Sequence, residues 1–126
     1  MILSIGIDLI EVERVRQTTA RTPRFVERVF TERERAYCES RGAAAAQSFA
    51  ARFAAKEAAL KALKTGWRDG ITWHDVEIAS EPSGAPYLIL TGKAKEIFDT
   101  MGANAIHLSL SHTSQHAIAQ VVIEKR

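Results

Sequence analysis

The chain has 126 residues, enough for one hydrophobic core without disulfide or metal staples and too few for two catalytic domains. Its 17 basic and 15 acidic residues leave a formal charge of +2, which is too near balance for a dedicated nucleic-acid binder. A hydrophobic content of 46% with 25% charged residues argues against disorder. We therefore expect one domain over residues 1–126.

The cysteine count and the first residues bear on the compartment. Cys38 is the only cysteine, which excludes an intramolecular disulfide and favours a reducing environment. The opening stretch MILSIGIDLIEVERVR has no basic segment, and Asp8 interrupts its apolar run. This pattern fits neither a signal peptide nor a membrane span, so we expect a cytoplasmic protein.

The first predicted element is a strand over residues 2–10. Its apolar residues alternate with period two, and the face that we expect to enter the core carries Leu3, Ile5, Ile7 and Leu9. The opposite face contains a glycine, a serine and a carboxylate, so we do not expect it to be fully dry.

Helices are predicted through the rest of the first half. The first covers residues 11–19, and the second covers 25–30 with Pro23 in its first turn and Thr22 as its cap. Thr31 and Glu34 have the spacing of a capping box at the start of a third helix. The longest helix is expected over 46–64, followed by Gly66 and Gly70 as stop signals.

The second half changes to short alternating segments. Strands are predicted over 76–79, 87–90, 106–111 and 117–123, with a turn over 80–86 and a helix over 94–101. Helices thus precede antiparallel strands. The order predicts an α+β fold in which an antiparallel sheet packs against the long helix and shorter helices.

Two carboxylates stand in unusual places. Asp8 interrupts the first strand, and Glu57 lies at the margin of the apolar stripe of the long helix, about 40° from Phe53. Asp8 could instead cap the following helix, and Glu57 could form an ordinary surface pair with Lys61. Together, the two acids fit a site for Mg²⁺, which proteins often hold with one or two carboxylates plus water and substrate phosphates.

Basic residues around these acids indicate an anionic ligand. Arg52, Lys56, Lys61 and Lys64 follow one another along the long helix, and such side chains bind phosphate. His112 follows an alternating strand, which places it either near a site or in a solvated turn.

A row of arginines precedes the long helix. It comprises Arg14, Arg16, Arg21, Arg24 and Arg28 against the single acid Glu27. A solvated helix surface and a docking surface for an acidic protein both account for this row.

Several of these segments resemble one known family. The stretches are GIDLIEVER (6–14), FVERVFT (25–31), RFAAKEA (52–58), Lys61 to Gly66, and SLSHT (109–113). In this order and spacing they are similar to the holo-[acyl-carrier-protein] synthases, the short single-domain class of 4′-phosphopantetheinyl transferases. The resemblance runs almost end to end and implies the phosphopantetheinyl transferase fold.

The resemblance also implies a reaction. Coenzyme A would donate its 4′-phosphopantetheine group to a serine of apo acyl carrier protein, an acidic protein substrate, with release of adenosine 3′,5′-bisphosphate during fatty acid biosynthesis. Asp8 and Glu57 would bind Mg²⁺, with Glu57 and Lys61 as the catalytic residues. By the same resemblance, coenzyme A would contact Arg52, Lys61, Lys64, Gly66, His112 and Thr113.

The family further implies a homotrimer with its sites at subunit interfaces, and carrier-protein docking by Arg14, Arg21 and Arg24.

One departure from the family pattern concerns the metal ligands. Larger two-domain relatives present an Asp-x-Glu pair, whereas this chain has Ile10 at the second position, so we expect water to fill that coordination position.

Two other classes of function are compatible with parts of this pattern. A non-catalytic module that binds coenzyme A or a carrier protein would keep the arginine row and the lysines but need no metal. A nucleic-acid binder would need a larger net charge and aromatic residues interleaved with the basic ones, which the chain lacks. We expect partners to include neither nucleic acid nor membrane.

Overall fold

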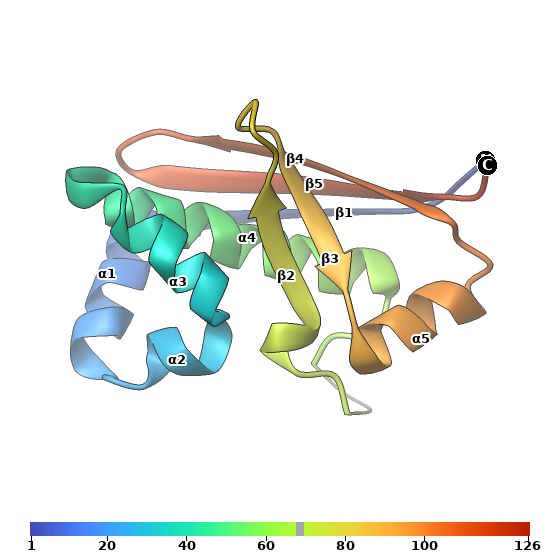
Figure 1. Cartoon of the computed structure of the whole chain (residues 1–126), viewed down its shortest axis with the longest axis horizontal. Helices are drawn as coiled ribbons and strands as arrows, with labels where there is room; N and C mark the ends of the chain where they lie inside the picture. The colour runs from blue at the N-terminus through green and yellow to red at the C-terminus, as the bar shows by residue number, and fades with distance from the viewer. Residues whose placement is uncertain (68–69) are drawn as a thin grey trace.

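A three-stranded antiparallel sheet lies along one long helix and forms the centre of the molecule (Figure 1). The computed structural model of the protein describes residues 1–67 and 70–126. The strand order is β1-β5-β4, and the strands and helix are β1 (Ile2–Glu11), β4 (Ala105–His112), β5 (His116–Glu124) and α4 (Ala45–Leu63). The predicted α+β class, with an antiparallel sheet on the long helix, is confirmed.

A hairpin and shorter helices cover the rest of α4. These elements are β2 (Val76–Ser80), β3 (Pro86–Leu90), α1 (Val12–Arg21), α2 (Phe25–Val29), α3 (Glu32–Glu39), η1 (Gly42–Ala44), η2 (Trp73–Asp75) and α5 (Gly92–Thr100). The hairpin of β2 and β3 crosses in front of α4 in Figure 1, with α1, α2 and α3 to one side and α5 to the other. Within residues 1–67 and 70–126, no helix has both the length and the apolar character that a membrane crossing requires.

Helix boundaries follow the predicted signals at one position and depart from them at two. Thr31 and Glu34 form the predicted capping box, with both reciprocal hydrogen bonds present. Pro23 lies in a turn before α2 and not in its first turn. Thr22 is the C-cap of α1, and Arg24 is the N-cap of α2. The end of α4 is set by Lys64, which takes the left-handed conformation at φ 63°, instead of by Gly66.

Helix α4 is buried almost all round, whereas the sequence predicted a single apolar stripe. It packs against the sheet, the hairpin and α1, so small side chains are needed on several faces. The buried small residues are Ala50, Ala51, Ala54, Ala55, Ala58, Ala59 and Ala62. A helix that is apolar on all sides belongs to the interior of a protein, and α4 is the element around which the other layers are arranged.

The predicted core face of the first strand is wrong. Residues Ile5, Ile7 and Leu9 are 54%, 52% and 63% exposed, while Ser4 and Gly6 on the other face are buried against α4. The reason is steric, since a Cβ at Gly6 would overlap the carbonyl oxygen of Ala58. The small residues therefore let the strand backbone pack directly on the helix.

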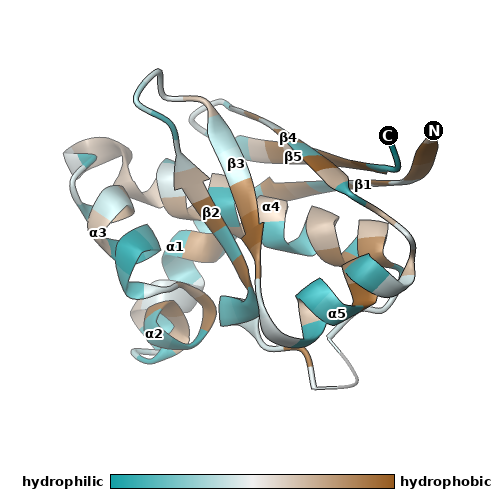
Figure 2. Ribbon diagram, turned by 45° about the vertical axis from the view of Figure 1, so that its right-hand side comes forward, coloured by the Kyte–Doolittle hydropathy of each residue, from teal (hydrophilic) through white to brown (hydrophobic). Residues whose placement is uncertain are grey.

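The exposed face of the sheet is apolar across two strands. Ile5 is opposite Val122 in the β1–β5 register, and Leu9 is opposite Ile118, which is itself 37% exposed. The N-terminal end of β1 is one of the strongly hydrophobic parts of the ribbon in Figure 2. Strand β5 is the central strand, with its inner residues fully buried, so the open outer face marks a surface suited to a partner.

Gly6 provides a test of the close approach of β1 to α4. Gly6→Ala should lower the free energy of unfolding by about 1–3 kcal/mol, because the added methyl group forces the strand away from the helix backbone. Urea unfolding followed by circular dichroism measures this change. Ser4→Ala is the matched control on the same buried face and should be close to neutral. Wild-type stability of Gly6→Ala would contradict the assigned packing.

Candidate active site

Asp8 and Glu57 line the same open pocket, which has a volume of about 440 Å³. Asp8 lies two residues after Gly6 on the strand face that meets α4, and Glu57 precedes Ala58, the helix residue that Gly6 approaches. The contact between strand and helix therefore fixes where both carboxylates lie. The structure brings together the two acids that the sequence selected from different elements.

Lys61, one turn after Glu57 on α4, reaches from the helix to β1. Its Nζ is 3.0 Å from Oδ1 of Asp8 and donates a hydrogen bond of 2.9 Å to the carbonyl oxygen of Ile7. The alternative of a simple Glu57–Lys61 surface pair is therefore wrong, because the lysine pairs with Asp8. Asp8 is not a helix cap either, since Glu11 occupies the N-cap position of α1.

Glu57 has an electrostatic environment that disfavours its negative charge. Burial, followed by the neighbouring charge of Asp8, raises the pKa of the Glu57 carboxyl, while Trp67 and Lys61 act in the opposite direction. Nε1 of Trp67 is buried without another hydrogen-bond partner among the described residues, and as a nearby donor it favours the charged form of Glu57. No feature of the sequence pattern had singled out Trp67.

The ligand set of this pocket is small. Among residues 1–67 and 70–126, no three His, Cys, Asp or Glu side chains gather closely enough to hold a metal ion by themselves. Ile10 lines the same pocket, and its side chain offers no oxygen ligand. Two carboxylates that repel each other electrostatically fit a divalent cation, and Mg²⁺ is the ion that keeps its remaining positions for water and phosphate.

An apolar wall and an arginine complete the pocket. The rings of Phe25 and Phe53 are 5.8 Å apart between centroids, and Arg14 lies on the α1 side. Arg21 ends α1 and Arg24 lies just before α2, both exposed to solvent. Arg14 is thus the member of the arginine row that lines the carboxylate pocket. Phe25 was predicted as a helix residue and Phe53 as part of the apolar stripe of the long helix, so the sequence assigned neither to a pocket.

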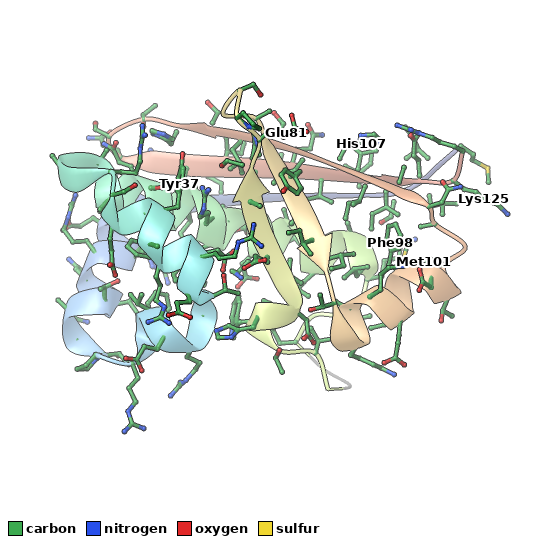
Figure 3. All side chains as sticks on the ribbon, in the orientation of Figure 1. Tyr37, Glu81, Phe98, Met101, His107 and Lys125 are labelled. Carbon is green, nitrogen blue, oxygen red and sulfur yellow. The ribbon has the colours of Figure 1, made fainter. Side chains whose placement is uncertain are left out.

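A second pocket contains the predicted coenzyme A residues Arg52 and His112. Arg52 is 4% exposed, its Nη2 donates to Oγ of Ser80 at 3.2 Å, and its guanidinium lies 4.0 Å from the ring centroid of Tyr37. Tyr37 is in the last turn of α3, at the end near the sheet (Figure 3). The Nε of Arg52 is buried and has no partner among the residues that the structure describes.

The two pockets lie on different sides of α4. Arg52 and Glu57 are five residues apart, which separates them by about 140° around the helix axis. Arg52 faces α3 and the end of β2, whereas Glu57 faces α1 and β1. One chain therefore does not bring Arg52 and His112 to the two carboxylates.

The other predicted coenzyme A residues lie at two chain turns. Lys64 and Gly66 follow the end of α4, both with positive φ. Thr113 is in the turn between β4 and β5, where its Oγ1 accepts from the backbone of His116 at 3.0 Å. The positive φ of Lys64 is the left-handed conformation that ends α4, and it is uncommon for a residue with a side chain.

Lys56 does not take part in a phosphate site, which corrects the prediction from the sequence. Its side chain is fully buried, and its Nζ is 2.9 Å from Oε1 of Glu34. The lysine faces the α3 and β2 side of α4, while Glu57, its neighbour in sequence, faces the pocket. Only Lys61 and Lys64 of the predicted lysines remain exposed.

The chain is similar in sequence to known proteins over nearly its whole length. Residues 4–121 match the model of the 4′-phosphopantetheinyl transferase superfamily. The holo-[acyl-carrier-protein] synthase of Koribacter versatilis is 50% identical over 98% of this chain and 99% of its own length. The same enzyme of Trichlorobacter lovleyi is 46% identical over 98% of each chain.

Solved structures agree with the sequence relatives. The crystal structure of the Neisseria meningitidis holo-[acyl-carrier-protein] synthase matches with a TM-score of 0.88 at 30% identity, covering 99% of this chain and 100% of that chain. The Helicobacter pylori synthase, solved in complex with coenzyme A, matches with a TM-score of 0.82 at 32% identity, covering 95% and 99%.

The chain belongs to the 4′-phosphopantetheinyl transferase superfamily and, within it, to the holo-[acyl-carrier-protein] synthase family of enzymes. The family resemblance found in the sequence is confirmed.

The raised pKa of Glu57 predicts that its ionised carboxylate lowers the stability of the fold. An acid whose pKa is higher in the folded state binds its proton more tightly when folded. Stability is therefore lost as the pH rises from the unfolded pKa to the folded one, and stays reduced at neutral pH. Glu57→Gln removes this charge, so its melting temperature without metal should exceed that of the wild type by a few degrees.

Calorimetry at pH 7 without divalent ions checks this result. Glu96→Gln, on the exposed surface of α5, is the control and should leave the midpoint unchanged. A lower melting temperature for Glu57→Gln would show that the carboxylate stabilises the fold, which would contradict an unfavourable environment for its charge.

Proposed function

We propose that the protein transfers the 4′-phosphopantetheine group of coenzyme A to a serine of apo acyl carrier protein and releases adenosine 3′,5′-bisphosphate. The convergence of Asp8 and Glu57 in one pocket, with Lys61 paired to Asp8, is the observation that carries the proposal. The Helicobacter pylori relative, solved in complex with coenzyme A, supports the choice of donor.

Asp8 and Glu57 would hold Mg²⁺. When bound, this ion supplies positive charge that neutralises the diphosphate of coenzyme A and fixes its geometry. Without it, the two carboxylates would repel the same diphosphate, so we propose that the reaction depends on a divalent ion.

The side chains of the pocket account for the remaining charges and the proton. The serine oxygen forms a bond to the phosphorus on the pantetheine side, and the bond from that phosphorus to the bridging oxygen breaks. Lys61 is placed to stabilise the negative charge on the departing nucleotide. Glu57, whose pKa is raised by burial and by Asp8, is the acceptor that we propose for the serine proton.

The arginine row is the docking surface that we propose for the acidic carrier protein. Arg14 lies at the pocket with the carboxylates, and Arg21 and Arg24 are exposed at the end of α1 and just before α2. The apolar wall of Phe25 and Phe53 lies beside Arg14, so an acidic helix with some apolar residues would meet both kinds of contact.

We propose that three copies assemble, with sites at the subunit interfaces. The open apolar face of Ile5, Ile7 and Leu9 supports assembly, since such a surface is costly in water. The separation of the two pockets supports shared sites: Arg52 and His112 of one copy would complete the carboxylate pocket of another. Lys64, Gly66 and Thr113 would then contact the same coenzyme A molecule.

The pathway and the compartment are also proposals. Carrier proteins hold growing acyl chains on the transferred group, so we place the reaction in fatty acid biosynthesis. The single cysteine, Cys38, is buried and unpaired, which accords with a reducing compartment, and we propose the cytoplasm.

Incubation with coenzyme A, Mg²⁺ and apo acyl carrier protein tests the proposed reaction. Intact mass spectrometry should show that the carrier gains the mass of one phosphopantetheine group. A mutant carrier whose acceptor serine is replaced is the control. No gain in mass while coenzyme A still binds would favour a non-catalytic binding module instead.

The docking surface makes a separate kinetic prediction. Arg14→Glu should raise the KM for the carrier by about tenfold while leaving the KM for coenzyme A nearly unchanged, and added salt should weaken carrier binding in the wild type. Lys125→Glu makes the same charge change near the C-terminus and should have little effect. Equal effects of Arg14→Glu on both substrates would remove the docking role.

If the copies share their active sites, a substitution that separates the copies should also abolish activity. Ile7→Asp places a charge at the centre of the open apolar face, so light scattering should report a monomer with almost no transferase activity. Tyr87→Asp, at an exposed aromatic residue on β3, should keep both. A fully active monomeric Ile7→Asp variant would contradict the sharing of sites between copies.

A further inference from the structure

A buried ion pair joins four elements behind the carboxylate pocket. Glu34 and Lys56 are both fully buried, at 0% side-chain exposure, and their charged atoms are 2.9 Å apart. Burying two charges is costly unless every remaining hydrogen-bonding position is also filled. The contacts of the pair therefore indicate what it holds in place.

Both side chains are fully used. Lys56 Nζ donates to Glu34 and to the carbonyl oxygens of Trp73 and Val76, at 3.0 Å and 2.5 Å. Glu34 accepts from the backbone N–H of Thr31 and from that of Ile78, each at 2.8 Å. One pair thus connects the start of α3, the middle of α4, η2 and the beginning of β2.

The pair reaches the carboxylate pocket along a chain of packed aromatic rings. Lys56 holds the backbone of Trp73, whose ring is stacked on Phe53 at 5.3 Å between centroids. Phe53 in turn contacts Phe25, and both line the pocket with Glu57. Lys56 also precedes Glu57 on the same helix, so anchoring the lysine fixes the rotation of α4 that directs Glu57 toward Asp8.

We propose that Glu34 and Lys56 are positioning residues for the transferase reaction. They hold Glu57 and the Phe53–Phe25 wall in the geometry that the metal and the carrier protein need, without touching either substrate. This inference rests on the proposed function, because it assigns the pair a role in that same site.

Glu34→Gln tests the proposal with a small change of shape. Glutamine is accepted at this capping-box position, so the variant removes the charge while the helix start is retained. All assays run well below the melting midpoint of every variant, so that only folded protein is compared. The positioning role predicts a kcat lower by about 10–100-fold and a higher Mg²⁺ concentration for half-maximal rate.

A signal independent of turnover accompanies the kinetics. The near-ultraviolet circular dichroism of Glu34→Gln should differ from that of the wild type, because Trp73 no longer stacks on Phe53 in the same way. Asp99→Asn is the control, since it breaks an exposed ion pair with Lys95 on α5 and should change none of the three measurements.

The outcomes separate this inference from the proposed function. A folded Glu34→Gln variant with wild-type kcat, Mg²⁺ response and aromatic spectrum would overturn it, whatever its melting temperature. If Glu34→Gln does not fold, Glu34→Asp keeps the charge while shortening the side chain, and is judged by the same measurements with a smaller expected loss. Absence of transferase activity in the wild-type protein would instead reject the proposed function. The near-ultraviolet circular dichroism would still test whether the pair holds Trp73 against Phe53.

Discussion

The close approach of β1 to α4 is the constraint on which the active site depends. Gly6 has no side chain, so the strand backbone lies against the helix backbone at Ala58. Asp8 is on the same strand face, and Glu57 and Lys61 flank Ala58 on the helix. Two carboxylates and a lysine from distant parts of the sequence meet because these two backbones pack without an intervening side chain.

Helix α4 also explains why the predicted site residues are divided between different pockets. Its own alanines allow the neighbouring elements to pack closely on nearly every side, and its polar side chains point in different directions. Glu57 points to the β1 side, Arg52 to the end of β2, and Lys56 to the buried pair with Glu34. The open apolar face of the sheet supplies the surface through which a second copy would unite the two pockets.

The sequence predicted the order of elements, the class of fold and the two acids, because these follow from local period and from residues out of place. It misassigned the faces of β1, since Ile5, Ile7 and Leu9 have the pattern of a core and only the tertiary contact at Gly6 reverses it. It also misread Lys56, because burial opposite Glu34 is a pairing between distant segments that no helical spacing reveals.

The proposed mechanism depends most on the sharing of one divalent ion by Asp8 and Glu57 over the diphosphate of coenzyme A. A crystal grown with coenzyme A and Mn²⁺, measured for anomalous scattering, tests this sharing most directly. We expect one anomalous peak within coordination distance of both carboxylates and of the diphosphate oxygens. A peak bound by neither carboxylate, or a coenzyme A molecule seated away from them, would contradict the mechanism.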